Sequence, residues 1–246
     1  MPILDSNNMD SYSLGGQYGF SAKRIDELGA SEYTLALLVV DASGSVGAYR
    51  TQIESAIREV VRSCRKSPRA DNMMLRLVIF DSRVSEVHGF KPLSDCHEND
   101  YKGCLELGGA TALYDATCNA IASASHYGEL LTKQDYDVNA AVFVITDGMD
   151  NSSSATRKLV SDTMAECLRS EALESILSVL IGVNTGSGDL NEYLRVFKKD
   201  AGFDQYIAIN KASAAELAKL GGFVSQSISS QSQALGTGGA SKSLSF

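Results

Sequence analysis

The sequence predicts an α/β domain in which helices cover both faces of a mainly parallel sheet. Three apolar runs, at residues 34–40, 140–145 and 175–183, are continuous rather than alternating, which is typical of strands buried on both faces. Segments with apolar residues at helical spacing separate these runs, and such alternation of strand and helix favours a parallel sheet. The 246 residues are enough for one sizeable hydrophobic core.

The remaining elements follow in order along the chain. After the first strand, Ile53, Ile57 and Val60 recur at helical spacing. Residues 74–80 and 84–90 are strands separated by a short turn, so the second is predicted to be an antiparallel edge strand. Further helices are predicted at 112–127, 159–168, 190–199 and 214–228, with a short strand at 205–209.

Both ends of the chain differ in composition from the centre. Residues 1–30 are rich in Ser, Asn, Asp and Gly and are predicted to be an N-terminal arm. The domain is predicted to span residues 31–230, followed by a Ser- and Gly-rich tail at 231–246. This tail is either disordered or lies on the domain surface through Leu235, Leu244 and Phe246.

Charge and hydropathy exclude several classes of function. With 22 basic and 30 acidic residues, the net charge of −8 disfavours nucleic-acid binding, which depends on clustered Lys and Arg. No apolar run approaches the ~18 residues of a membrane-spanning helix, and the N-terminus lacks the pattern of a secretory signal. Five scattered cysteines fit reduced thiols, so we expect a cytoplasmic protein that binds neither nucleic acid nor membrane.

Oxygen-bearing side chains gather where the predicted strands end. Asp41, Ser43 and Ser45 follow the first strand, Asp147 follows the strand at 140–145, and Thr111 opens the helix between them. The carboxyl ends of parallel strands meet at one edge of a sheet, where ligands bind. Two carboxylates and three hydroxyls make an all-oxygen ligand set suited to Mg²⁺, with Mn²⁺ and Ca²⁺ as alternatives. Neutral hydroxyl ligands leave such an ion electron-poor, with a position open for a carboxylate from another molecule.

These residues belong to three motifs, Asp-x-Ser-x-Ser, Gly-Gly-x-Thr-Ala-Leu and Asp-Gly-x-Asp-Asn. Together the motifs resemble the metal-ion-dependent adhesion site (MIDAS) of von Willebrand factor A (vWA) domains, and the order of strands and helices around them is similar too. The resemblance implies a Rossmann-like three-layer α/β/α vWA fold. It also implies that Ser43, Ser45 and Thr111 bind the metal through hydroxyls, and that Asp41 and Asp147 bind it directly or through water.

The resemblance further implies binding rather than bond-making chemistry. Members of the family usually bind a protein partner through a Glu or Asp that completes the metal shell, so we expect a Mg²⁺-dependent adaptor and not an enzyme. Bacterial intracellular members act with AAA+ ATPases or in stress-response and defence assemblies, and a similar context is expected here. Two alternatives are a self-assembling protein whose tails supply the carboxylate, and a phosphatase-like hydrolase that uses Asp41 with Mg²⁺.

Simpler interpretations of the same residues stand beside these. Ser45 is also a candidate cap for the following helix, and Asp147 with Gly148 is also a common turn. Because Ala110 separates Gly109 from Thr111, Thr117 is the alternative hydroxyl ligand.

Two other polar segments allow two interpretations each. Asp150 and Asn151 either orient the loop around the metal or form a turn in which Asn151 caps the next helix.

The densest basic stretch is either a solvated helix face or a docking patch for an acidic partner. It consists of Arg58, Arg62, Arg65, Lys66 and Arg69.

Overall fold

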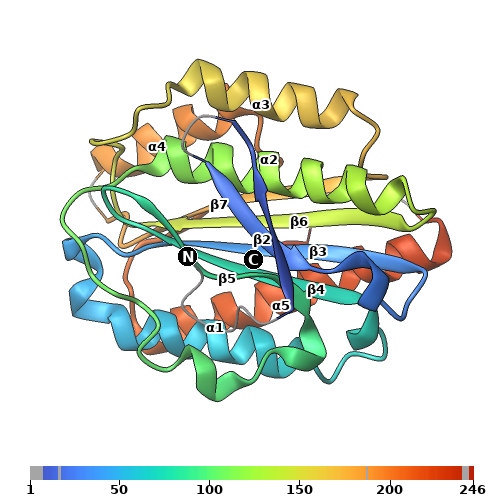
Figure 1. Ribbon diagram of the computed structural model, residues 1–246. Coiled ribbons are helices and arrows are strands. Elements are labelled where there is room, and N and C mark those ends of the chain that lie inside the picture. Colours follow the sequence, from blue (N-terminus) through green and yellow to red (C-terminus); the bar gives the residue numbers. More distant parts are fainter. Residues whose placement is uncertain (1–7, 16–17, 187, 240–243) are drawn as a thin grey trace.

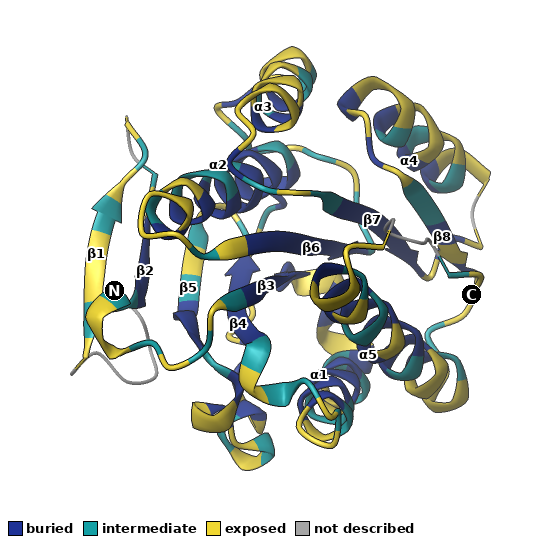
Figure 2. Ribbon diagram, turned by 90° about the vertical axis from the view of Figure 1, so that its right-hand side faces the viewer, coloured by how far each residue is buried: buried dark blue, intermediate teal, exposed yellow. Residues whose placement is uncertain are grey.

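The computed structural model describes residues 8–15, 18–186, 188–239 and 244–246. They form an eight-stranded sheet, in the order β1-β2-β5-β4-β3-β6-β7-β8, between two layers of helices (Figure 1). One face is covered by α1 (Arg50–Cys64) and α5 (Ala214–Thr237), and the other by α2 (Leu113–Thr132), α3 (Arg157–Arg169) and α4 (Gly188–Ala201) (Figure 2). The predicted three-layer α/β/α class is confirmed.

The central strand is β3 (Glu32–Asp41), which pairs in parallel with β4 (Met73–Phe80) on one side and β6 (Asp137–Thr146) on the other. β7 (Ile176–Val183) and β8 (Gln205–Ile209) continue the parallel sheet beyond β6. On the other side, β5 (Val84–Pro92) runs antiparallel to β4, as the short turn between them predicted. The carboxyl ends of β3, β4 and β6 therefore meet at one edge.

Consecutive residues of β3 are buried in two different cores, which explains its continuous apolar run. Leu35, Leu37 and Val39 pack in the core beneath α2, α3 and α4. Their neighbours, such as Leu38 and Val40, pack in the core beneath α1 and α5. Because side chains of a strand alternate between faces, a strand covered on both sides needs apolar residues at every position.

The N-terminal segment contributes to the sheet. β1 (Met9–Ser13) and β2 (Gly19–Lys23) form an antiparallel hairpin, and β2 pairs in parallel with β5 at Ala22 and Phe90. Residues 9–13 and 19–23 of the predicted arm thus extend the sheet beyond β5. β5 is therefore not the edge strand of the whole sheet, as predicted, but lies at the edge of the six strands β5-β4-β3-β6-β7-β8. The first seven residues of that arm lie outside the described residues.

The described C-terminal residues lie on the domain. α5 continues to Thr237, well past the predicted helix end at residue 228, and Leu235 on it is buried. Leu244 packs against the core, and the ring of Phe246 meets that of Phe223 edge-on at a centroid distance of 5.7 Å. Of the two alternatives predicted for the tail, these contacts agree with the one in which its apolar residues lie on the domain surface. Residues 240–243 of the predicted tail are outside the described residues.

Two features of the chain bear on its environment. Over the described ranges, no helix combines the length and the apolar character needed to cross a membrane. All five cysteines are free and buried.

Candidate metal centre

Asp41 is the innermost carboxylate of the site. It ends β3, the strand at the centre of the sheet, and is 1% exposed. Its Oδ1 accepts a hydrogen bond from the Ser43 backbone N–H at 2.8 Å, and its Oδ2 accepts one from Thr146 Oγ1 at 2.6 Å. Burial raises the pKa of the Asp41 carboxyl to about 6, because removal from water disfavours the charged form.

The second carboxylate, Asp147, lies in the loop after β6 and faces the hydroxyls that follow β3. Ser45 Oγ donates to Asp147 Oδ1 at 2.8 Å, and Ser45 Oγ lies 3.1 Å from Ser43 Oγ. Tyr49 OH donates to the other oxygen, Asp147 Oδ2. Burial and the neighbouring Asp147 carboxylate raise the pKa of Tyr49, so its hydroxyl remains a donor. Tyr49 carries no sequence signal for this role, because it lies outside all three motifs.

Thr111 reaches the same rim from the loop before α2. It is 4% exposed, and a pair of hydrogen bonds with Asn151 holds its backbone: Thr111 N donates to Asn151 Oδ1 at 2.8 Å, and Asn151 N donates to Thr111 O at 3.0 Å. Gly148 lies between Thr111 and Asp41. A Cβ on Gly148 would lie 3.3 Å from Thr111 Oγ1 and 3.8 Å from Asp41 Oδ2. The structure thus brings all five predicted ligand residues to one edge of the sheet.

The loops that carry these residues are tied to each other through their backbones. Gly108 N donates to Ala42 O at 2.8 Å, and Ala112 N donates to the backbone oxygen of Asp81 at 2.6 Å. Gly108 also packs directly on the Asp81 side chain, since a Cβ there would lie 1.7 Å from Asp81 Oδ2. This close approach explains why the loop before Thr111 contains glycine at this position.

The spacing of the oxygen atoms fits a small divalent cation. Adjacent oxygens of an octahedral Mg²⁺ shell with bonds of about 2.1 Å lie about 3.0 Å apart. Ser43 Oγ lies 3.1 Å from Ser45 Oγ, and Ser45 Oγ lies 2.8 Å from Asp147 Oδ1; these hydrogen-bond lengths are also compatible with neighbouring positions of such a shell. Across the described residues, no group of three or more His, Cys, Asp or Glu side chains is placed to hold a metal ion. A cation here would therefore depend on hydroxyl and water ligands beside two carboxylates.

The structure decides between several of the simpler readings. Within the described stretch 41–64, neither Ser43 nor Ser45 caps a helix through its side chain, so their hydroxyls are available to the rim. Thr117 Oγ1 donates to Leu113 O at 2.7 Å inside α2, whereas Thr111 lies in the loop beside Gly148 and Asp41, so Thr111 stays the predicted hydroxyl ligand. Asn151 does not cap α3, whose N-cap is Thr156; it orients the Thr111 loop.

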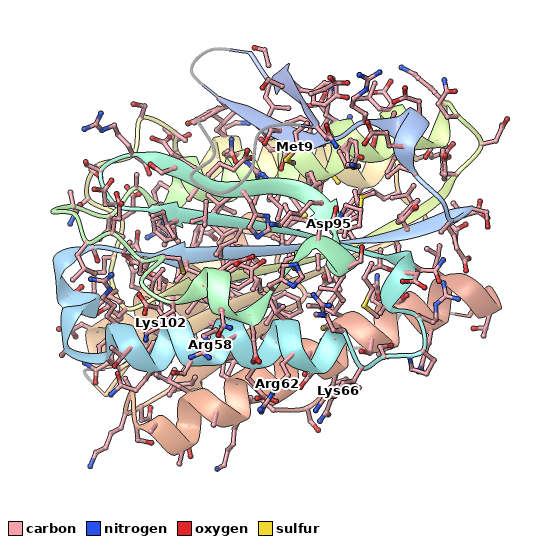
Figure 3. All side chains as sticks on the ribbon, turned by 60° about the horizontal axis from the view of Figure 1, so that its bottom comes forward. Met9, Arg58, Arg62, Lys66, Asp95 and Lys102 are labelled. Carbon is pink, nitrogen blue, oxygen red and sulfur yellow. The ribbon has the colours of Figure 1, made fainter. Side chains whose placement is uncertain are left out.

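The predicted basic stretch begins on α1 and continues past its end. It comprises Arg58, Arg62, Arg65, Lys66 and Arg69, of which Arg58 and Arg62 lie on α1 and Lys66 follows shortly after its last residue (Figure 3). Arg58 and Arg65 donate to backbone carbonyl groups in the segment 94–98. Arg69 donates to Ser232 on α5, and Arg62 pairs with Glu59. Because the four arginines bind groups of their own domain, the structure gives less support to a docking patch on this face.

Comparisons with known proteins support the fold. No protein-family model matches the sequence, and no curated protein matches it either. Among solved structures, the PilB minor pilin from Streptococcus sanguinis superposes with a TM-score of 0.59 at 14% identity, covering 89% of this chain and 66% of that one. The pilus adhesin SpaC from Lactobacillus rhamnosus GG gives a TM-score of 0.57 at 12% identity, covering 81% and 31%.

A third similar structure is proximal thread matrix protein 1 from the mussel byssus, in a form described as having a zinc-occupied MIDAS motif. It gives a TM-score of 0.51 at 21% identity and covers 81% of this chain and 46% of that one. The chain thus spans between about a third and two thirds of the length of these three proteins. At such identities the likeness establishes the fold, and it supports the predicted vWA-type Rossmann-like architecture.

Proposed function

We propose that this chain is a Mg²⁺-dependent protein-interaction module whose candidate metal centre captures a carboxylate from a partner protein. The observation that carries the proposal is the convergence of Ser43, Ser45 and Asp147 oxygens at the spacing of a metal shell. Asp41 and Thr111 complete the set from two further loops. When bound, the ion supplies a Lewis-acidic position for an outside carboxylate. The zinc-occupied MIDAS motif of the mussel protein supports a divalent cation in this fold.

The rim around these residues describes the expected partner. Leu107 and Met149 flank the site on two of its loops and are 42% and 38% exposed. Exposed large apolar side chains beside a polar centre are typical of interaction surfaces. Asp81 and Asp150 add negative charge near the rim. The partner's acidic residue is therefore expected to stand beside an apolar side chain and to be flanked by Lys or Arg.

The proposal includes an adaptor role without catalysis in a reducing compartment. Five free, buried thiols support a cytoplasmic protein, since disulfides are rare there. Association with an AAA+ ATPase or with a stress-response or defence assembly remains part of the proposal, as does the identity of the cation. The described ends of the chain give less support to self-assembly through the tails, because Leu244 and Phe246 contact their own domain.

Metal binding is tested by calorimetry with Mg²⁺ and by electron paramagnetic resonance with Mn²⁺. We expect one site in the wild type and none in the Ser43→Ala, Asp147→Ala double variant. Ser82→Ala, an exposed serine on a neighbouring loop, is the matched control and should bind as the wild type does. Binding that survives in the double variant would show that the cation lies elsewhere.

The interaction itself is tested by affinity capture with wild type and Thr111→Ala, each with Mg²⁺ or chelator. We expect a partner that is retained only by the wild type with Mg²⁺. A partner retained equally in all four conditions would contradict a metal-dependent contact. Phosphatase assays on the wild type and Asp41→Asn address the enzyme alternative, since Mg²⁺-dependent turnover lost in that variant would replace the adaptor proposal.

A further inference from the structure

Arg157 is the first residue of α3 and follows the loop that carries Asp147 and Asp150. We propose that its guanidinium is a second subsite of the interaction surface, which binds a further carboxylate of the same partner protein. This inference rests on the proposed function, because it adds a second contact to the carboxylate at the candidate metal centre. Figure 2 shows α2, α3 and α4, which supply Arg157 and its supporting residues, over the same face of the sheet.

Two tyrosines hold the guanidinium of Arg157 in place. Its Nε donates to Tyr114 OH at 2.7 Å, and its Cζ lies 4.7 Å from the ring centroid of Tyr193. Tyr114 OH and Tyr193 OH lie 2.5 Å apart, which ties the two rings to each other. A guanidinium that is already stacked and hydrogen-bonded loses little further side-chain freedom when it binds an anion. The tyrosines therefore preorganise this positive charge for a ligand.

The same tyrosines connect Arg157 to the candidate metal centre. Tyr193 OH accepts a hydrogen bond at 3.1 Å from the backbone N–H of Asp150, three residues after Asp147. Three successive contacts, none longer than 3.1 Å, thus lead from Arg157 through Tyr114 and Tyr193 to the loop of the metal centre. The two sites are therefore close enough for one short segment of a partner to occupy both.

The domain itself makes little use of this positive charge. Among the described residues, Arg157 pairs with one carboxylate, Asp200, at 3.4 Å between Nη1 and Oδ2. The Asp200 side chain is 44% exposed, and exposed ion pairs contribute little to stability. Arg157 also begins a helix, where a positive charge opposes the helix dipole. The stability of α3 therefore does not explain an arginine at this position.

The chemistry of the subsite favours a carboxylate as its ligand. With Nε of Arg157 bound to Tyr114, the two Nη groups remain as a planar pair of donors that matches the two oxygens of a carboxylate. The Arg157 side chain is 32% exposed, so an outside group reaches it. The net charge of −8 repels a second negative charge on a partner. A partner that binds more tightly because of that charge must place it beside a fixed cation.

The test uses the full chain and synthetic peptides that carry one Glu and, two to six residues later, either a second Glu or a Gln. Extended segments of these lengths span about 7 to 20 Å. Affinities are measured by calorimetry in the presence of Mg²⁺. At the best spacing we expect the peptide with two Glu residues to bind about fivefold more tightly than its Gln counterpart, the upper value for an exposed ion pair.

Variants assign this preference to the subsite. Arg157→Gln should abolish it, and Asp200→Asn should increase it, because Arg157 then has no competing carboxylate. Arg169→Gln is the matched control, since Arg169 is exposed at the other end of α3 and donates to Ala165 O. This control should keep the fivefold preference.

A second measurement tests the subsite without metal. The Nε–H signal of Arg157 is followed by ¹⁵N NMR in chelator while sodium acetate is added, and sodium chloride at equal ionic strength is the control. We expect the signal to shift with acetate and not with chloride. The Nε–H of Arg169, which is bound to Ala165 O, should shift less with acetate.

Three results would overturn the inference. The first is Mg²⁺-dependent binding in which the two kinds of peptide are equal at every spacing. The second is a preference for the second Glu that survives in Arg157→Gln, and the third is an Arg157 Nε–H signal that does not respond to acetate. If no peptide binds in a Mg²⁺-dependent manner, the failure lies in the proposed function, and the NMR titration alone decides whether Arg157 binds a carboxylate.

Discussion

Replacing Asn151 by Ala tests whether the Thr111 loop is held in place for a metal. The side chain accepts from Thr111 N at 2.8 Å, and Thr111 is 4% exposed, so the variant leaves a buried N–H without its partner. The free energy of unfolding should fall by about 1–3 kcal/mol. For a domain of this size, each kcal/mol lowers Tm by about 2–4 °C. Because such supporting contacts orient metal ligands, Mn²⁺ affinity should fall about 10- to 100-fold.

Thermal denaturation and Mn²⁺ binding on the same samples separate the two effects. Asn151→Asp keeps an acceptor for Thr111 N–H and should retain most of the affinity. Asn99→Ala, at an exposed asparagine far along the chain, is the control for the loss of an amide and should change neither quantity. If Asn151→Ala lowers Tm but binds Mn²⁺ like the wild type, the position of Thr111 does not matter for the metal, and the assigned ligand set is wrong.

Three further predictions concern the scaffold. Gly108→Ala places a Cβ 1.7 Å from Asp81 Oδ2, so it should lower both Tm and Mn²⁺ affinity, whereas Gly109→Ala, with nothing within 4 Å, should alter neither. Burial lowers the pKa of His88 to about 3, so only the unfolded chain takes up its proton between about pH 6.5 and 3. The free energy of unfolding should therefore fall by up to about 1.4 kcal/mol per pH unit as the pH drops through that window. When it is measured by urea denaturation at several pH values, it should depend less steeply on pH in His88→Gln than in the wild type. Arg76→Met leaves the Glu86 carboxylate without its buried partner and should cost about 3–5 kcal/mol; an unchanged urea midpoint would contradict this reading of the pair.

The sheet was predictable from sequence because its strands are buried on both faces. The run at residues 35–40 has no polar position to obscure it, and the structure places its side chains alternately in two cores. The hairpin β1–β2 gave no such signal, since it combines Ser, Gly and Asp with few apolar residues. Its attachment depends on Asn119 and Glu86, which lie far away in sequence.

The end of α5 was missed for a related reason. Residues 225–237 are rich in Ser, which favours caps and turns in isolation. In the structure Ser227 and Ser232 of this segment are buried, Asn139 Nδ2 of β6 donates to Gln231 O at 2.8 Å, and Arg69 Nε donates to Ser232 Oγ at 3.0 Å. These contacts with the domain stabilise the end of a helix that local propensity does not predict. Tertiary contact overrides local preference at this position.

At the candidate site, the sequence motifs identified the predicted ligand residues but not the residues that hydrogen-bond to them. Asp41, Ser43, Ser45, Thr111 and Asp147 meet at one rim, as the strand-end rule predicted. The motifs gave no indication of Tyr49, which donates to Asp147 from the end of a short helical turn. Its partner is 98 residues away, so only the folded arrangement of the loops reveals it.

The position of Asp41 links the core to the proposed interaction. β3 has a parallel neighbour on each side, and both neighbours also hold its end: Ala42 N donates to Phe80 O at 2.8 Å, and Thr146 Oγ1 donates to Asp41. The buried carboxylate is therefore held at the end of the central strand, and turning it to solvent would break its hydrogen bonds with Ser43 N and Thr146 Oγ1. A divalent cation at the rim would offset the cost of that buried charge, while a net charge of −8 still repels an acidic partner at a distance. The attraction between the cation and the partner's carboxylate then outweighs this repulsion only at short range. We therefore expect association with an acidic residue to depend on the metal for its affinity and on basic flanking residues of the partner for its rate.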